Sequence, residues 1–328
     1  MKKKIILLLC LLMLLVCADI LWGSVHLPFA EVWRVFTGNS TDIIYQEIVL
    51  NHRLPKALTA ILAGASLSVA GVLMQTLFRN PLAGPDVLGV TSGAGLGVAL
   101  LTLGSSTLPL FLLTGWGQIV AAVAGAVSVL LLVILTSIRV PQTVSLLIIG
   151  MMFGNFAGAI VSILQSVSNP DTLKLFITWT FGSLSSVSWS QMGVMAPVVL
   201  LGVGISFCLQ KRLNILLLGE SYATALGVSV FQTRLWVVLA TALLAGVSTA
   251  FTGPIAFIGV TMPHVARALF QTSNHRVLIP ASLLCGAIVL LACDLISQLP
   301  GSQGTLPINS ITALFGAPLI IWIIMKKS

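Results

Sequence analysis

Residues 213–230, LNILLLGESYATALGVSV, interrupt an otherwise apolar chain and decide how its helices are arranged. Their longest apolar run, residues 215–218, is followed at once by the tetrapeptide GESY. A transmembrane helix needs about 20 predominantly apolar residues, and a charged residue at its centre costs about 2.5–3.5 kcal/mol. The segment is therefore expected to lie outside the lipid, and its neighbours Lys211, Arg212 and Arg234 indicate the cytoplasmic side. We predict that it is a platform against which another protein pushes.

The composition around this segment is that of a membrane protein. The chain has 328 residues, of which 57% are hydrophobic and 7% charged, whereas a soluble domain carries about 25% charged residues. This indicates an all-α polytopic protein embedded in the lipid bilayer. The formal net charge of +8 is explained by Lys and Arg on cytoplasmic loops, so no nucleic acid partner is expected. The five cysteines lie in apolar runs without the spacing of metal ligands.

The apolar runs predict ten transmembrane helices. They lie at residues 5–22, 57–78, 88–103, 119–138, 144–167, 193–209, 235–251, 255–270, 277–295 and 308–325. With the N-terminus inside, twelve of the 16 Lys and Arg residues fall in the cytoplasm, and Arg34, Arg53, Lys56 and Lys174 fall outside. This asymmetry follows the positive-inside rule and places both termini in the cytoplasm. The first run also has the basic start of a signal peptide, but its cleavage site is poor, so we expect a retained span.

Two predicted spans carry glycine at every fourth position along one face. These glycines are Gly89, Gly93 and Gly97 in the third span, and Gly150, Gly154 and Gly158 in the fifth. Small residues at this spacing let helix backbones approach closely, so tight helix packing is the first interpretation. The alternative is that these faces line or flex a translocation pathway. Pro254 and Pro263 bracket the eighth span, which we expect to be partly broken.

No group of residues in the sequence indicates catalysis. The only Lys followed by Ser or Thr is Lys327, next to Ser328, and it lacks the glycine-rich loop of a nucleotide-binding motif. The four histidines are scattered and form no metal-binding pair. We therefore expect no enzyme activity, no catalytic residue, no cofactor and no metal site.

Asp19 and Asp294 are ionisable residues within or at the end of apolar runs, where such groups are functional candidates. Both lie near predicted outer ends, so we expect them to be hydrated. With so few buried charges, an ion-coupled secondary transporter is less favoured, because it would need titratable or ion-coordinating groups near the bilayer midplane. It remains the alternative from a different class.

Three parts of the sequence resemble one family. They are RLPK at residues 53–56 with AGASLSVAGVLMQTLFRNPLAGPDVLGVTSGAGLG at 63–97, LGESYATALGV at 218–228, and GPIAFIGVTMPHVAR at 253–267 with NHRVLIPAS at 274–282 and LPINSITALFGAPLIIWII at 306–324. Together they are similar to the FecCD family, the permease subunits of type II ABC importers for iron chelates, haem and cobalamin. The resemblance covers essentially the whole chain from Arg53 onward.

The resemblance implies a single transmembrane permease domain over residues 1–328 of a bacterial cytoplasmic membrane protein. Its implied partners are a second copy of the chain, two ABC ATPase subunits that hydrolyse the ATP, and an extracytoplasmic substrate-binding protein. Transport by alternating access is expected, with an iron siderophore as the first substrate and haem or cobalamin as alternatives.

The resemblance also assigns contacts. The platform matches the segment that couples to the ATPase, with candidate contacts at Leu218, Gly219, Glu220, Ala223, Leu226 and Gly227. At the outer mouth, Arg53 and Lys56 match basic residues that engage acidic groups of the binding protein. A further position, basic in some members, is Gln298 here.

Overall fold

The computed structural model describes residues 2–23, 27–38, 42–104, 109, 113–139, 143–298 and 305–327. Within these ranges the chain is helical and contains no β-strand, which confirms the all-α class. The helices are α1 Lys2–Leu21, α2 Phe29–Phe36, α3 Ile43–Gln46, the π-helix η1 Glu47–Arg53, α4 Leu54–Leu77, the 3-10 turn η2 Pro85–Leu88, α5 Val90–Thr102, α7 Trp116–Arg139, α8 Thr143–Val167, α9 Pro170–Thr180, α10 Trp189–Cys208, α11 Gln210–Leu216, α12 Glu220–Ala225, α13 Val230–Thr252, α14 Ile258–Phe270, α15 His275–Ser297 and α16 Ile308–Lys327.

Among the described residues, seven helices are long and apolar enough to cross a membrane. They are α1, the continuous run Ile43–Leu77 that contains α4, then α7, α8, α10, α13 and α15. Each corresponds to a span predicted from the sequence. The prediction of an integral membrane protein is therefore confirmed.

The three other predicted spans correspond to α5, α14 and α16. α5 and α14 have 13 residues each, about 20 Å of helix, whereas the hydrocarbon core is about 30 Å thick. α16, Ile308–Lys327, has 20 residues, as many as α1 and α10. In the eighth predicted span, residues 253–257 form the connection from α13, and α14 runs from Ile258 to Phe270 without interruption, with Pro263 inside it. The count of ten membrane-crossing segments stays a prediction.

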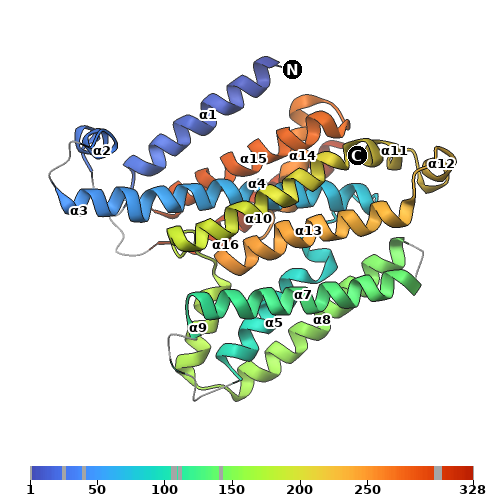
Figure 1. Ribbon diagram of the computed structural model, residues 1–328, viewed down its shortest axis with the longest axis horizontal. Coiled ribbons are helices and arrows are strands. Elements are labelled where there is room, and N and C mark those ends of the chain that lie inside the picture. The colour runs from blue at the N-terminus through green and yellow to red at the C-terminus, as the bar shows by residue number, and fades with distance from the viewer. Residues whose placement is uncertain are drawn as a thin grey trace.

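α4 is the central helix of the fold, and α15, α13, α14 and α10 pack around it (Figure 1). Nearly all of its residues are buried. The closest approaches are made by glycines: a Cβ on Gly64 would lie 2.3 Å from the carbonyl oxygen of Gly286 on α15. A Cβ on Gly71 would lie 1.7 Å from the carbonyl oxygen of Gly259 on α14. Such close backbone contact replaces the hydrophobic drive that is absent between helices in lipid.

α5, α7 and α8 form a second group, which joins the first through α13 (Figure 1). Gly93 and Gly97 of α5 face α7. A Cβ on Gly93 would lie 2.6 Å from the carbonyl oxygen of Gly125, and one on Gly97 would lie 1.9 Å from that of Ala121. These two glycines therefore lie at a tight helix–helix contact.

The other glycines singled out from the sequence lie along α8 and at the start of α5. Gly89 has a φ of +72°, and a Cβ there would lie 2.9 Å from the carbonyl oxygen of Gly150. Gly154 is less crowded, since its nearest neighbour would be Oγ of Ser92 at 3.2 Å. A Cβ on Gly158 would meet no atom of the described chain within 4 Å. Gly158 therefore lies outside the contact that the other glycines make.

One end of the molecule carries residues 213–230, hereafter the platform, with α11 and α12 (Figure 1). The N-terminus lies near the same end, because Nζ of Lys4 donates to the carbonyl of Leu269 in the last turn of α14 at 2.8 Å. α2, α3 and α9 lie toward the opposite end (Figure 1). The bundle thus has a platform end and an outer end, which carry different polar contacts.

Candidate functional site

The platform consists of two short helices whose turns depend on glycine. Gly219, between α11 and α12, has a φ of +117° and a ψ of 157°, a conformation that is essentially restricted to glycine. After α12, Gly227 has a φ of +78°. The N–H of Val228 donates to the carbonyl of Ala223 at 2.9 Å, and the N–H of Gly227 to that of Thr224 at 3.0 Å. This is the Schellman pattern, in which a glycine ends a helix.

The platform has a buried inner face and an exposed apolar outer face. The inner face is formed by Leu213, Leu216 and Ala223, which are at most 1% exposed. The outer face is formed by Leu217, Leu218, Tyr222 and Leu226, the last three of which expose 60–67% of their surface. Clustered apolar side chains exposed outside the lipid are typical of a protein-binding surface. Of the predicted contact residues, Leu218 and Leu226 point outward, whereas Ala223 packs against the bundle.

Glu220, another predicted contact residue, links the platform to two long helices. Its Oε1 accepts a hydrogen bond from the hydroxyl of Thr143, the first residue of α8. The Thr143 hydroxyl in turn accepts one from Nη2 of Arg234 on α13 at 2.9 Å. Arg234 also lies 3.9 Å from Glu220 Oε1. We call this chain of contacts the Glu220 bridge.

A second link starts from Asn214 on α11. Its Oδ1 accepts a hydrogen bond from the backbone N–H of His275 at 2.9 Å and lies 2.7 Å from His275 Nδ1. Nε2 of the same ring lies 2.8 Å from the Thr76 hydroxyl near the end of α4. Asn214 Nδ2 also donates to Oδ1 of Asn274, the residue that caps α15. We call these contacts the Asn214 bridge.

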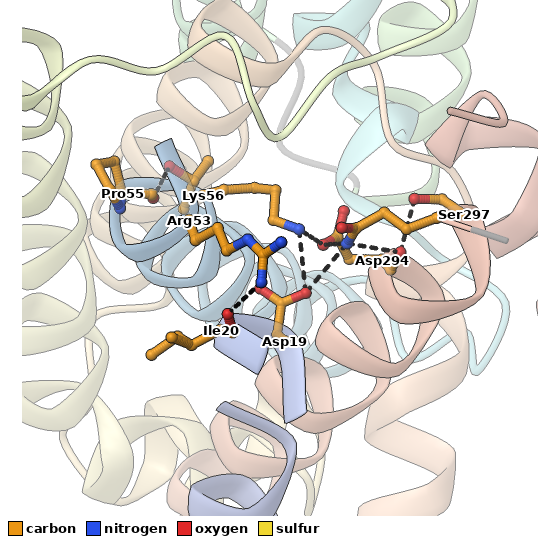
Figure 2. A network of polar contacts seen from close by, with 9 residues as sticks. Asp19, Ile20, Arg53, Pro55, Lys56, Asp294 and Ser297 are labelled. Carbon is orange, nitrogen blue, oxygen red and sulfur yellow. Dashed lines mark hydrogen bonds and ion pairs between the residues drawn. The ribbon is translucent and has the colours of Figure 1, made fainter. Parts of the chain in front are cut away.

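At the outer end, five polar side chains from α1, α4 and α15 and their ends form a buried cluster (Figure 2). Nζ of Lys56 lies 3.1 Å from Oδ1 of Asp19 and 2.7 Å from Oδ2 of Asp294. Nη1 of Arg53 donates to the carbonyl of Ile20 in the last turn of α1 at 2.6 Å, where a helix end attracts positive charge. The cluster therefore ties three helices together.

The expected hydration of the two aspartates is wrong. Asp19 is 0% and Asp294 is 5% exposed, and Arg53 and Lys56 are each 6% exposed. Two carboxylates can be buried together because the formal charges of the four residues sum to zero, and buried charges are tolerated when paired. The predicted docking residues Arg53 and Lys56 thus already have partners within the chain, and their contact with a binding protein stays a prediction.

Gln298 completes this cluster. Its Nε2 donates to Oδ2 of Asp294 at 2.7 Å and to Oδ1 of Asp19 at 3.2 Å. The amide supplies hydrogen bonds to both carboxylates without adding charge. A basic side chain at this position would leave the cluster with a net positive charge.

Sequence reasoning missed the residues that connect the platform to the long helices. Thr143 and Asn214 belong to common residue types in short polar stretches, and no local pattern marks them. The pairing of Lys56 with Asp19 and Asp294 had a usable signal, because an ionisable residue inside a span usually has a partner. Lys56 and both aspartates lie at the outer ends of their predicted spans.

A cavity of about 310 Å³ lies at the outer ends of α7, α9 and α13. Its polar lining consists of hydroxyl and amide groups, including those of Gln118, Thr178, Ser186 and Gln191. Trp179 and Phe251 add aromatic surface. The volume is at the lower limit of pockets for drug-sized ligands.

These features define an integral membrane protein with a helical platform at one end and a neutral, buried charge cluster at the other. The chain belongs to the FecCD transport family, whose model matches residues 11–326. The family indicated by the sequence is therefore confirmed.

Individual relatives give the same result. The chain is 38% identical over 277 residues to the vitamin B12 import system permease protein BtuC of Salmonella arizonae, covering 84% of this chain and 82% of that protein. It is 38% identical over 316 residues to the ABC transporter permease protein YvrB of Bacillus subtilis, covering 93% of this chain and 88% of that protein. A solved metal-chelate type ABC transporter in an inward-facing conformation matches with a TM-score of 0.88 and 31% identity, over 99% of this chain and 100% of that chain. The chain is thus an ABC-transporter permease of the bacterial cytoplasmic membrane.

Proposed function

We propose that this chain is the translocation subunit of an ATP-driven importer that moves a metal chelate inward by alternating access. The chain's own sequence has no P-loop, so the ATP is hydrolysed by two partner ATPases. The observation that carries the proposal is the platform. Its outer face exposes Leu218, Tyr222 and Leu226 at one end of the bundle, while Glu220 and Asn214 hydrogen-bond it to the long helices.

The proposed topology is a single permease domain over residues 1–328 with ten spans and both termini in the cytoplasm. The helices α5, α14 and α16 complete the count. Two observations support this arrangement: twelve of the 16 basic residues fall on one side, and the bond from Lys4 to Leu269 brings the N-terminus near the platform end.

We further propose that two copies of the chain form the pathway between them. The outer-end cavity of about 310 Å³ is at the lower limit for drug-sized ligands, and a bulky chelate needs more room than this cavity offers. A path between two copies supplies that room without opening the packed core around α4.

The proposed cargo is a bulky metal chelate, with a ferric siderophore as the first candidate and haem as an alternative. Cobalamin is a candidate of equal interest, because relatives at 38% identity are named as vitamin B12 import permeases. The cargo is handed over by an extracytoplasmic binding protein at the outer end. Docking there by Arg53 and Lys56 requires carboxylates of the binding protein to replace Asp19 and Asp294 as their partners.

Uptake into reconstituted vesicles tests the proposal. The chain is assembled with its ATPase and binding protein, and a ferric hydroxamate siderophore, haem and cyanocobalamin are supplied in separate experiments. We expect uptake of one of them only with ATP and both partners. Uptake that proceeds without the ATPase and follows an imposed ion gradient would instead establish the alternative, an ion-coupled transporter, in which the buried Asp19–Lys56–Asp294 group would be the titratable site.

A further inference from the structure

We propose that Glu220 and Asn214 are positioning residues, and that their two bridges carry each movement of the platform into different helices of the bundle. This inference rests on the proposed function, since it concerns how ATPase movement reaches the pathway. It adds the side chains that transmit the movement, Thr143 and Arg234 on one bridge and His275 and Thr76 on the other. None of these four residues lies on the exposed face that would meet an ATPase.

The platform needs such bridges because its chain connections alone permit pivoting. α12 is flanked by Gly219 and Gly227, both with positive φ. Glycine has more backbone conformational freedom than any other residue, so turns built on glycine can rotate. A six-residue helix held only by two such turns would rotate under load, and the force would not reach the spans.

The Glu220 bridge prevents this rotation at the first residue of α12. Glu220 is 41% exposed at its side chain, whereas that of Arg234 is 3% exposed. Thr143 lies between them, donating to Glu220 and accepting from Arg234. Hydrogen bonds that involve a charged partner are about twice as strong as neutral ones. The bridge therefore fixes α12 to the start of α8 and to α13.

The Asn214 bridge holds α11 in the same way, but to other helices. His275 is 0% and Thr76 is 3% exposed, so the contacts beyond Asn214 are shielded from water. Breaking a buried hydrogen bond leaves an unsatisfied polar group and costs more than breaking an exposed one. The bridge therefore fixes α11 to the start of α15 and the end of α4.

The two bridges share no residue. The Glu220 bridge reaches α8 in the second group of helices and also α13, which packs against α4, while the Asn214 bridge ends on α15 and α4. α8 packs against α5 and α7, whereas α15 packs against α4, α14 and α1. A displacement of the platform therefore moves both the helices packed around α4 and the group formed by α5, α7 and α8. This arrangement predicts that cutting either bridge weakens transmission, and that cutting both weakens it further, because distant sites act additively.

The test compares paired variants in the complete transporter. Thr143→Val and Asn214→Leu remove the bridging groups. Thr143→Ser keeps the hydroxyl, and Asn214→Asp keeps the oxygen that accepts from the His275 N–H and gives up only the Nδ2 bond to Asn274. Thr136→Val is the matched control, since within the part of the chain that the structure describes the Thr136 hydroxyl bonds to carbonyls of its own helix. Each variant is assembled with ATPase and binding protein in vesicles. Uptake of cyanocobalamin or a ferric hydroxamate siderophore is measured per ATP hydrolysed, together with ATPase affinity and thermal stability.

We expect Thr143→Val to lower uptake per ATP by about tenfold, the order expected for losing one hydrogen bond to a charged group. Asn214→Leu should lower it similarly, the double variant should lower it further, and ATPase affinity should stay unchanged. Thr143→Ser, Asn214→Asp and Thr136→Val should keep the wild-type ratio, which a merely structural role would not explain. A wild-type ratio in both Thr143→Val and Asn214→Leu, or an equal loss in Thr143→Ser, would overturn the bridges while leaving the proposed function intact. A wild-type complex without ATP-dependent uptake of any chelate would overturn both.

Discussion

The ammonium group of Lys56 on α4 lies 2.7 Å from Oδ2 of Asp294 on α15, in a region of the bundle that excludes water. The same ammonium lies 3.1 Å from Asp19 on α1, so one cation holds the outer ends of three helices. Breaking a buried pair is costly because the remaining partner stays buried with an uncompensated charge. This relationship makes Lys56 the residue on which the outer end depends most.

Lys56→Met should therefore destabilise the chain by about 3–5 kcal/mol, the cost of removing one partner from a buried ion pair. Thermal unfolding of the purified chain in detergent measures the change. The control is Arg34→Met, because the Arg34 side chain is 59% exposed and, among the described residues, pairs with Glu31 on its own helix. Loss of that exposed pair should cost about 1 kcal/mol or less. Equal effects of the two substitutions would show that the cluster does not stabilise the outer end.

Asp19→Asn should raise the affinity of the binding protein severalfold. In the proposed docking, carboxylates of the binding protein must displace Asp19 and Asp294 from Lys56. The substitution removes one of these internal carboxylates, so the binding protein meets less competition for Lys56. Surface plasmon resonance on the chain in nanodiscs measures the affinity. If Asp19→Asn has no effect while Arg34→Ala and Lys174→Ala weaken binding, docking uses the exposed cations instead, and the role predicted for Arg53 and Lys56 is wrong.

Gly219→Ala should weaken coupling to the ATPase. The backbone of Gly219, at φ +117° and ψ 157°, would cost a residue with a Cβ about 1–3 kcal/mol, so α12 should leave its position. Binding of the ATPase subunit and the ratio of uptake to ATP hydrolysis measure the effect. Gly219→Val combined with Glu220→Lys should uncouple transport fully while the spans stay folded.

The control for Gly219 is Gly204→Ala on α10, where a Cβ meets open space. This substitution should leave coupling unchanged and stabilise the helix by about 0.5–1 kcal/mol. Wild-type transport in the Gly219→Val, Glu220→Lys double variant would contradict the assignment of the platform as the coupling segment.

Gly97→Ala should destabilise the contact between α5 and α7, because the added Cβ would lie 1.9 Å from the carbonyl oxygen of Ala121. Overpacking of this kind costs about 1–3 kcal/mol. Gly158→Ala is the matched substitution on α8 and should leave the stability of a single chain unchanged, since a Cβ there meets open space. Unfolding of the monomer in detergent compares the two.

If Gly158→Ala lowers uptake without lowering monomer stability, Gly158 faces the pathway or the second copy. If it destabilises the monomer as much as Gly97→Ala does, the face of α8 that carries Gly158 is packed within one chain, contrary to the structure.

The sequence by itself determined the class, the positions of seven spans and the place of the platform. These follow from local properties: an apolar run of sufficient length must enter the lipid, and GESY at residues 219–222 cannot remain there. The family motifs are long enough to identify the FecCD family without any coordinates. Gly219 and Gly227 were also identifiable, because residues at turns next to a short helix are commonly glycine.

Only the tertiary structure decided which polar residues meet. Lys56 and Asp294 are 238 positions apart in the sequence, yet their side chains are in contact. The sequence indicates that an ionisable residue at a span end has a partner, but not which distant residue that partner is. The expectation of hydration failed for Asp19 and Asp294 because burial depends on whether helices from distant parts of the chain bring a cation to the same place. The same reason hid Thr143 and Asn214. Hydropathy and motifs are properties of a segment, whereas a bridge or an ion pair is a property of how the segments pack.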